Sequence, residues 1–194
     1  PGQMSVATAT PGPVMAIGAV EPSAPFGAGT DEYREIAYLV GPAGIRFVSL
    51  KDGSTIRSVP LESVSCVSTL GRGPFYLGTS DGRIVPAEVG FKVEYQDGGR
   101  TQEPAARTDK PIRIVQDQPI RIIAHGKAKL AVLANELLLV TIHEKKGATG
   151  AVRRTAESAP FPVEGTITAL AVDNRGDDLY VGTAEGRIVR VDLR

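Results

Sequence analysis

The side chains best suited to chemistry are few and stand apart from one another in the sequence. The two histidines, His125 and His143, are followed by Gly126 and Glu144, and neither has a second His or Cys at the spacing of metal ligands. The sequence contains no phosphate-binding glycine motif, no Gly-x-Ser-x-Gly nucleophile elbow and no paired carboxylates beside a histidine. We therefore expect no catalytic residue, no metal site and no cofactor, and predict that the chain is not an enzyme.

Two further features imitate functional sites but have simpler interpretations. Cys66, the single cysteine, lies in an apolar alternating run, which is typical of a buried packing residue. The segment 173–178, Asp-Asn-Arg-Gly-Asp-Asp, resembles part of a calcium loop and spells an Arg-Gly-Asp tripeptide, but it lacks the alternating acids and closing Glu of such a loop. Because Asn, Gly and Asp are the residues that a tight turn requires, we predict a hairpin turn there.

The charges balance overall and cluster in one place. Lys plus Arg and Asp plus Glu each number 22, so no long-range attraction draws the chain to nucleic acid, and we expect no nucleic-acid partner. A mildly basic zone contains Lys127, Lys129, Lys145, Lys146, Arg153 and Arg154. This zone is either a solvated rim or a docking face for an acidic partner or for phosphate, and Lys145, Lys146, Arg153 and Arg154 are the candidate docking residues.

An internal repeat is the strongest pattern in the chain. Residues 75–85 (FYLGTSDGRIV) and 179–189 (LYVGTAEGRIV) are identical at seven of eleven positions. Weaker copies occupy residues 36–46 and 130–140, so the units recur near residues 38, 76, 131 and 180. A recurrence of roughly 40 to 50 residues in which every unit is built from short strands is typical of β-propeller blades.

The repeated residues have structural roles to play within such units. Tyr38, Tyr76 and Tyr180 occupy one equivalent position, and we expect them to pack between adjacent blades. Gly78 and Gly182 lie in the middle of a strand, where the close approach of a neighbouring blade would explain a missing side chain.

The second turn of each strong unit carries another repeated glycine. Gly82 and Gly186 lie where a tight hairpin loop needs a residue in the left-handed conformation, which a Cβ atom disfavours.

These patterns predict an all-β fold, a β-propeller with four blade-like antiparallel sheets that form part of a larger propeller. The propeller spans residues 31–194, with units near 31–60, 61–100, 111–145 and 163–194, and the polar segments 89–107 and 145–159 are predicted as long hairpin connections. Residues 1–30, rich in Pro, Gly and Ala, are a linker or an N-terminal strand segment with candidate strands at 4–10 and 14–20. No run approaches the roughly 18 apolar residues of a membrane helix, so this part is expected to be soluble.

Closure of the ring is an open question at this level. The chain begins at Pro1, as a piece of a longer protein would, and the last unit has three strands where a blade normally has four. A strand from residues 4–20 would close a compact four-bladed ring, or further blades would follow Arg194. We favour the second alternative, in which the isolated chain is an open arc that self-associates through its unpaired sheet edge or open blade faces.

Residues 179–193 resemble the middle and third strands of a blade in WD40-like or quinoprotein-like propellers. The chain departs from true WD40 repeats because it has no Gly-His opening and no Trp. It also lacks the Trp docking motifs of quinone-dependent dehydrogenases, so the resemblance does not imply their cofactor.

A more particular resemblance is to the propeller insert of long bacterial phosphate ABC-transporter permeases of the PstC type. It rests on residues 31–38 (DEYREIAY) and on the blade that begins at 167–173 (ITALAVD). The resemblance implies a position after a first membrane helix, at the periplasmic face of the bacterial inner membrane, with membrane contact only through parts of the protein outside this chain. It implies no catalytic residues.

Three functional hypotheses follow. The favoured one is a soluble, non-enzymatic interaction module that docks a protein partner, such as a phosphate-binding protein or another transporter subunit. The second is a small-molecule-binding or catalytic propeller with a site in its central channel, where convergent polar side chains would be required. The third is an unrelated cytoplasmic WD40-like scaffold.

Overall fold

The computed structural model describes residues 25–68, 74–96, 99–126, 129–146, 152–173 and 175–194. Every regular element in these ranges is a β-strand, apart from one short 3-10 turn, η1 (Glu32–Arg34). The predicted all-β fold is therefore confirmed. The candidate strands at 4–10 and 14–20 lie outside the described residues.

Two four-stranded meanders and their connection make up the first half of the molecule. Sheet 1 contains β1 (Gly27–Asp31), β2 (Ile36–Gly41), β3 (Gly44–Ser49) and β4 (Thr55–Pro60), paired in that order. Sheet 2 contains β5 (Val64–Val67), β6 (Phe75–Thr79), β7 (Arg83–Gln96) and β8 (Gly99–Thr108), and the short β9 (Ile112–Arg113) pairs with the start of β7. β8 extends this sheet past the unit predicted to end near residue 100.

The second half repeats the same antiparallel order. Sheet 3 contains β10 (Ile122–His125), β11 (Lys129–Leu133), β12 (Leu137–Lys146) and β13 (Val152–Pro160). Sheet 4 contains β14 (Ile167–Val172), β15 (Asp178–Thr183) and β16 (Ile188–Asp192). β13 carries sheet 3 beyond the unit predicted to end near residue 145.

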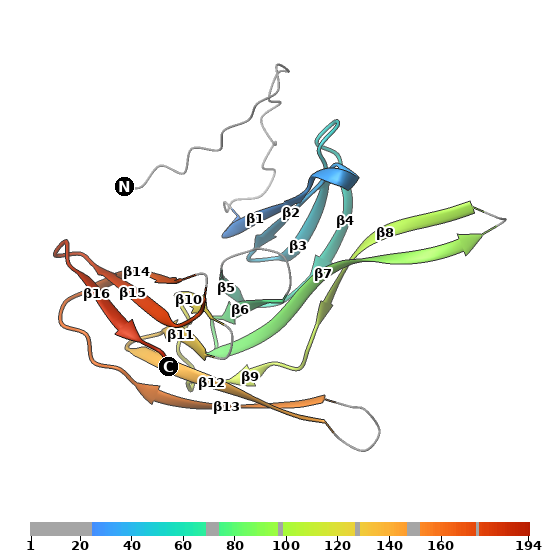
Figure 1. Ribbon diagram of the computed structural model, residues 1–194. Coiled ribbons are helices and arrows are strands. Elements are labelled where there is room, and N and C mark those ends of the chain that lie inside the picture. Colours follow the sequence, from blue (N-terminus) through green and yellow to red (C-terminus); the bar gives the residue numbers. More distant parts are fainter. Residues whose placement is uncertain (1–24, 69–73, 97–98, 127–128, 147–151, 174) are drawn as a thin grey trace.

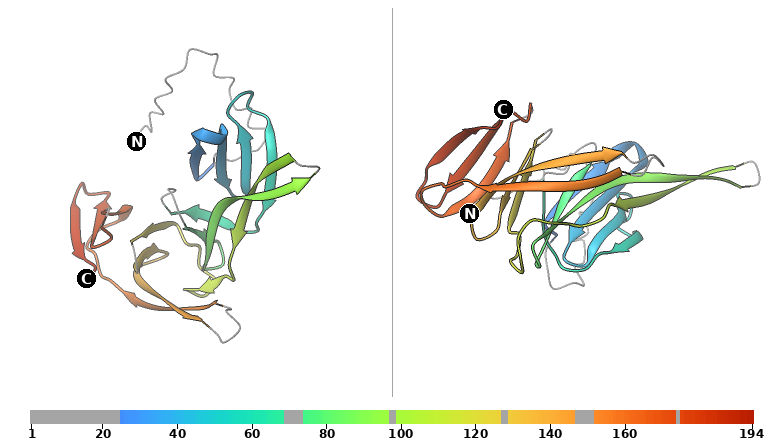
Figure 2. Two further views of the ribbon diagram at one scale, coloured as in Figure 1. Left: turned by 45° about the vertical axis from the view of Figure 1, so that its right-hand side comes forward. Right: turned by 90° about the horizontal axis from the view of Figure 1, so that it is seen from below.

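The four sheets follow one another around an arc in the order of the sequence, which is the arrangement of a four-bladed β-propeller (Figure 1). Each sheet contacts the next, and no extensive contact joins sheet 1 to sheet 4 among the described residues. Figure 2 (left) shows the blue first sheet and the red last sheet at the two ends of the arc.

Hydrophobic clusters fill the three junctions between consecutive sheets. Because side chains alternate between the two faces of a strand, each sheet can present one apolar face to its predecessor and another to its successor. The first junction joins Tyr38, Val40, Ile45 and Phe47 of sheet 1 to Val64, Phe75, Leu77 and Ala87 of sheet 2. The second joins Cys66 and Ile84 to Ile123, Leu130, Val132, Leu138 and Val140, and the third joins Ala124, Ala131, Leu133 and Leu137 to Leu179, Val181, Val191 and Leu193.

Two hairpins extend well beyond the short strands of an ordinary blade. β7 and β8 pair from Ala87↔Thr108 to Gln96↔Gly99, and β12 and β13 pair from Leu138↔Pro160 to Lys146↔Val152. Both occupy the segments that were predicted as long hairpin connections. The first hairpin projects away from the arc (Figure 1).

Candidate interaction surface

The basic docking residues predicted from sequence lie on the second long hairpin, β12–β13, here called the basic hairpin. Its backbone register places Lys145 opposite Arg153 and Glu144 opposite Arg154. The side chain of Lys145 is exposed. The side chains of Lys146 and Arg153 and the turn at 147–151 lie outside the described residues.

Arg154 differs from its basic neighbours because its charge is already matched. Its Nε lies 2.6 Å from Oε1 of Glu144, its Nη1 pairs with Asp109, and its side chain is only 26% exposed. Asp109 follows β8, so this ion-pair cluster connects the basic hairpin to the chain that leaves sheet 2. Arg154 therefore holds the basic hairpin against the chain that leaves sheet 2. Of Arg154 and Lys145, Lys145 is the residue whose positive charge is exposed.

The first long hairpin, which we call the arm (β7 from Ala87 onward, with β8), is braced against sheet 1. The guanidinium of Arg34 lies 4.1 Å from the centroid of the Phe91 ring, and its Nε donates a 3.0 Å hydrogen bond to Oε1 of Gln102. Nη1 of Arg57 in β4 donates to the carbonyl of Pro104 at 3.3 Å. These contacts orient the base of the arm, and a cation over an aromatic ring adds stabilisation of its own.

One face of the arm carries an apolar stripe. Phe91, Val93 and Tyr95 alternate along β7 and so point to the same side of the ribbon. Val93 is 39% exposed and Tyr95 is 76% exposed. Tyr33, 92% exposed, adjoins this stripe, because Arg34 contacts both the Tyr33 ring and the Phe91 ring.

Sequence reasoning missed this stripe, although a signal for it is present. The average composition of residues 89–107 is polar and predicts a connection, which conceals the stripe. The odd-numbered positions taken alone show Phe91, Val93 and Tyr95 in alternation, which is the pattern of one strand face.

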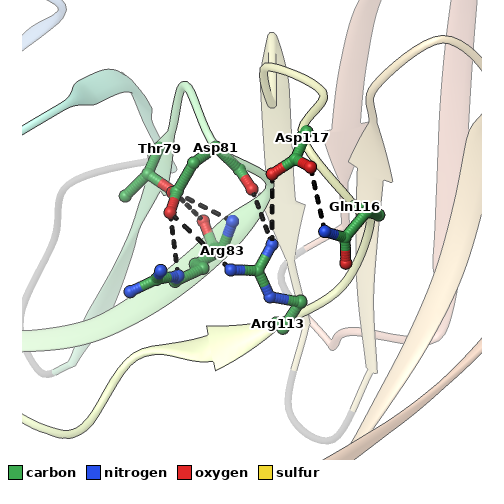
Figure 3. Close-up of polar contacts among 6 residues, drawn as sticks. All are labelled: Thr79, Asp81, Arg83, Arg113, Gln116 and Asp117. Carbon is green, nitrogen blue, oxygen red and sulfur yellow. Dashed lines mark hydrogen bonds and ion pairs between the residues drawn. The ribbon is translucent and has the colours of Figure 1, made fainter.

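The turn between β6 and β7 gathers charged side chains into a compact cluster (Figure 3). Oγ1 of Thr79 donates to Oδ1 of Asp81 at 2.6 Å, and Nε of Arg83 lies 2.9 Å from Oδ2 of Asp81. Nη1 of Arg113 in β9 donates to the carbonyl of Asp81 at 3.2 Å, and Asp117 lies 3.8 Å from the same guanidinium nitrogen. The Thr79 hydrogen bond, assisted by the two arginines, lowers the pKa of Asp81. Opposite charges match throughout, so the cluster closes the turn and offers no excess charge to a ligand.

The repeated turn glycines adopt the left-handed conformation that their turns require, with φ of 86° at Gly82 and 79° at Gly186. Their surroundings differ. A Cβ at Gly82 would collide with the carbonyl oxygen of Val115, whereas one at Gly186 would meet nothing within 4 Å.

The three repeated tyrosines lie on the same face of their sheets but in different surroundings. Tyr38 is 8% exposed in the cluster between sheets 1 and 2. Tyr76 lies edge-on against His125 of sheet 3, with ring centroids 5.6 Å apart. Tyr180 is 39% exposed.

The mid-strand glycines show the same contrast. A Cβ at Gly78 would lie 2.5 Å from Sγ of Cys66 and 2.8 Å from Cγ2 of Ile120, which belongs to the segment leading into sheet 3. At Gly182 the nearest atom is the Cβ of Ala169 at 3.4 Å, an ordinary contact. Close approach of a following segment therefore accounts for Gly78 and not for Gly182.

The residues that suggested chemistry are held in packing or turn positions. Burial raises the pKa of the Cys66 thiol to about 11. Nε2 of His143 lies 3.4 Å from Glu157 on the exposed face of the basic hairpin. Oδ1 of Asp173 accepts hydrogen bonds from the backbone N–H groups of Asp177 and Asp178, as a turn would require. Within the described ranges, no group of three or more His, Cys, Asp or Glu side chains is arranged to hold a metal ion.

A cleft of about 590 Å³ lies between sheets 3 and 4. The residues that line it include the apolar Leu133, Leu137, Phe161 and Val163 and the charged Arg121 and Glu136. Nε of Arg121 donates a hydrogen bond to the carbonyl of Ala134 at 2.9 Å, and this bond fixes the orientation of the guanidinium. This cleft, rather than the arm, is where a small molecule would find mixed apolar and charged walls.

In the part of the chain that the structure describes, none of the helical elements has the length and apolar character to span a membrane.

Comparisons with known proteins do not place this chain in a family. No protein-family model matches the chain, and no curated protein matches it.

Proposed function

We propose that this chain is a non-enzymatic interaction module that docks a protein partner through the arm. The observation that carries the proposal is the exposed stripe of Val93 and Tyr95 on a hairpin that projects from the propeller (Figure 2, right). Tyrosine is enriched at protein interfaces and among their energetic hot spots, because its ring is apolar and its hydroxyl can still form hydrogen bonds.

The construction of the arm favours binding in a second way. In the described residues, β7 beyond Ala87 and β8 pair only with each other, so the ribbon presents backbone donors and acceptors along its outer edges. Bracing by Arg34 and Arg57 holds the base of this ribbon in one orientation. Pre-organisation lowers the entropy that would otherwise be lost when a partner binds.

The basic hairpin adds an electrostatic contribution to the proposed docking. The exposed Lys145, with Lys146 next to it in the sequence and Arg153 opposite it in the strand register, would attract an acidic partner. Exposed charges at the rim of an interface act mainly on the rate of encounter, and their effect falls with salt. Arg154 is left out of this role because Glu144 and Asp109 already neutralise it.

The resemblance to the PstC-type insert supports a setting for this module. In that setting the propeller lies at the periplasmic face of the bacterial inner membrane as part of a phosphate ABC-transporter permease, and its partner is the soluble phosphate-binding protein or another transporter subunit. Membrane-spanning helices encoded in the same reading frame would support this setting. A reading frame without them would support a cytoplasmic scaffold instead.

The docking proposal is tested by biolayer interferometry with the immobilised chain and the transporter's phosphate-binding protein in solution. We expect saturable binding, and Tyr95→Ser should weaken it by roughly tenfold or more, as loss of a hot-spot side chain does. Leu50→Ser, which removes a 49% exposed apolar side chain from the β3–β4 turn, is the matched control and should change affinity less than twofold or so. Absence of binding by the unaltered chain, or equal weakening by both variants, would contradict the proposal.

The cleft between sheets 3 and 4 favours one alternative function, the binding of a small anionic molecule beside Arg121. Inorganic phosphate is the first probe, measured by the shift of the thermal unfolding midpoint. A saturable rise that Arg121→Gln abolishes would support this alternative over the docking function. An unchanged midpoint would remove it.

A further inference from the structure

The two outer edges of the arm differ in how well they can accept another strand. The edge of β8 lies beside β4 of sheet 1, and Nη1 of Arg57 donates a 3.3 Å hydrogen bond to the carbonyl of Pro104. Proline has no backbone N–H, so Pro104 also interrupts the row of donors along this edge. The edge of β8 is therefore blocked in its middle.

The edge of β7 is open over the whole arm. β6 pairs with β7 from Gly78↔Ile84 to Phe75↔Ala87, where β6 begins. Beyond Ala87, β8 covers one side of β7 as far as Gln96, and no described strand pairs with the other side. This opening lies in the middle of the chain and next to a sheet that already has its strands in order.

The hydrogen bonds at the base of the arm show which backbone groups point to the open edge. The carbonyl of Pro86 accepts a 2.9 Å hydrogen bond from the N–H of Asp109, which follows β8. In an antiparallel ladder, the N–H and C=O of one residue point to the same side, and the side alternates from residue to residue. The groups that point away from β8 are therefore those of the odd-numbered residues Val89, Phe91, Val93 and Tyr95.

The opposite strand agrees with this assignment. Pro104 is the register partner of Phe91, and its carbonyl points away from β7, toward Arg57. Phe91 and Pro104 thus form a pair that exchanges no hydrogen bond, as the alternation requires.

The residues that offer these backbone groups also carry the apolar stripe. In an antiparallel pair, side chains directly opposite one another lie on the same face and contact each other. A strand added at the edge of β7 would therefore cover Phe91, Val93 and Tyr95 with its own apolar residues at alternate positions. The other face of β7 carries the exposed Glu88 and Lys92, so the residues between would be polar.

Resting on the docking function proposed above, we propose that the partner contributes an extended segment that pairs with the outer edge of β7 along residues 89–95 as an added antiparallel strand. The segment has apolar residues at alternate positions, facing the stripe, and polar residues between them. Main-chain hydrogen bonds supply affinity in such strand addition, and the alternate side chains supply specificity.

The first test titrates the isotope-labelled full-length chain with a capped peptide of this pattern, acetyl-Lys-Val-Thr-Val-Thr-Val-Lys-amide. We expect saturable changes in the amide chemical shifts of Val89, Phe91, Val93 and Tyr95, and smaller changes at the amides that bond to β8. A peptide whose valines are N-methylated lacks the donors that would face β7, so it should cause no such changes. Unchanged shifts at the outer amides, or equal changes with both peptides, would overturn the proposal.

The second test compares Val93→Pro with Val93→Ser. Both variants remove the 39% exposed apolar side chain, but only proline removes the N–H that points to the open edge. Neither change removes a donor from the β7–β8 ladder, and the amide spectrum of each variant verifies that this ladder is intact. Val93→Pro should bind the peptide about fivefold more weakly than Val93→Ser, the usual effect of one hydrogen bond. Equal affinities would refute strand addition.

The phosphate-binding protein separates this inference from the docking function. If the peptide occupies the edge of β7 but that protein does not bind, the docking proposal fails and strand addition stands. If that protein binds and Tyr95→Ser weakens it, while Val93→Pro and Val93→Ser bind it equally, the arm docks through its stripe and strand addition is wrong.

Discussion

The phenol ring of Tyr76 in β6 lies edge-on against the imidazole of His125 in β10, with centroids 5.6 Å apart and an interplanar angle of 63°. This contact spans the junction between sheets 2 and 3. Nδ1 of His125 is buried there without a hydrogen-bond partner in the structure. Burial disfavours the charged imidazolium, so it lowers the pKa of His125.

The first prediction concerns pH. The folded-state pKa of His125 lies below the unfolded value of about 6.5, so in acid the unfolded chain takes up a proton that the folded chain resists. This residue's contribution to stability is present above about pH 6.5 and is lost as the pH falls toward the folded pKa. His125→Phe keeps a ring against Tyr76 and removes the titration. Urea unfolding at pH 7.5 and pH 5.5 should therefore show a smaller acid-induced loss in the variant, by at most about 1.4 kcal/mol per pH unit. An equal loss in both proteins would contradict the assignment.

The second prediction concerns Cys66. A thiol with a pKa near 11 is almost entirely protonated at pH 8, and this one is also buried. Because the thiolate is the reacting species, Ellman's reagent should label the native chain at least about a hundredfold more slowly than the urea-unfolded chain. As the chain has one cysteine, the signal has a single source. Rapid labelling without denaturant would show that the junction between sheets 2 and 3 opens.

The third prediction separates Arg154 from Lys145. Arg154→Ala breaks the ion pairs with Glu144 and Asp109 and should lower the free energy of unfolding by about 1 kcal/mol, the upper end for ion pairs near a surface. Lys145→Ala, at the neighbouring register position, should change it by less than about 0.5 kcal/mol. The two effects are read from chemical denaturation at low salt, and the Arg154 effect should shrink in high salt. Equal effects would mean that the cluster does not stabilise the hairpin.

The fourth prediction compares two glycines with similar backbone angles. Gly186→Ala should cost about 1 kcal/mol, because alanine is strained at a φ of 79° and meets no neighbour. Gly82→Ala carries the same strain and also drives a Cβ into the backbone of Val115, so its total cost should reach roughly 3 kcal/mol. Denaturation midpoints of the two variants provide the comparison. Matching midpoints would show that the 114–115 connection is free to move aside.

The long hairpins show which parts of the fold the local sequence predicts. Short apolar runs punctuated by Gly and Asp predict strands and turns, because strand periodicity and the conformational freedom of glycine are properties of the chain itself. The repeat between residues 75–85 and 179–189, together with the weaker copies at 36–46 and 130–140, therefore predicts the antiparallel units, the β-propeller and the turns at Gly82 and Gly186. The stripe on the arm was within reach of the same reasoning, since Phe91, Val93 and Tyr95 alternate, but an average over the segment conceals it.

Other features depended on neighbours that the repeat does not specify. Arg154 appears in the sequence as one of several basic residues, and only the fold brings Asp109 to its side, 45 residues earlier in the chain. Gly78 and Gly182 are equivalent in the repeat, yet Ile120 lies close above Gly78, whereas Gly182 has only ordinary contact with Ala169 of its own sheet. Tyr76 and Tyr180 are likewise equivalent in the repeat, yet Tyr76 packs against His125 of the next sheet and Tyr180 is 39% exposed. The sequence by itself determined strands, turns and the alternation of faces, which are local; the tertiary structure decided which faces are covered, because burial depends on what chain segment arrives from elsewhere.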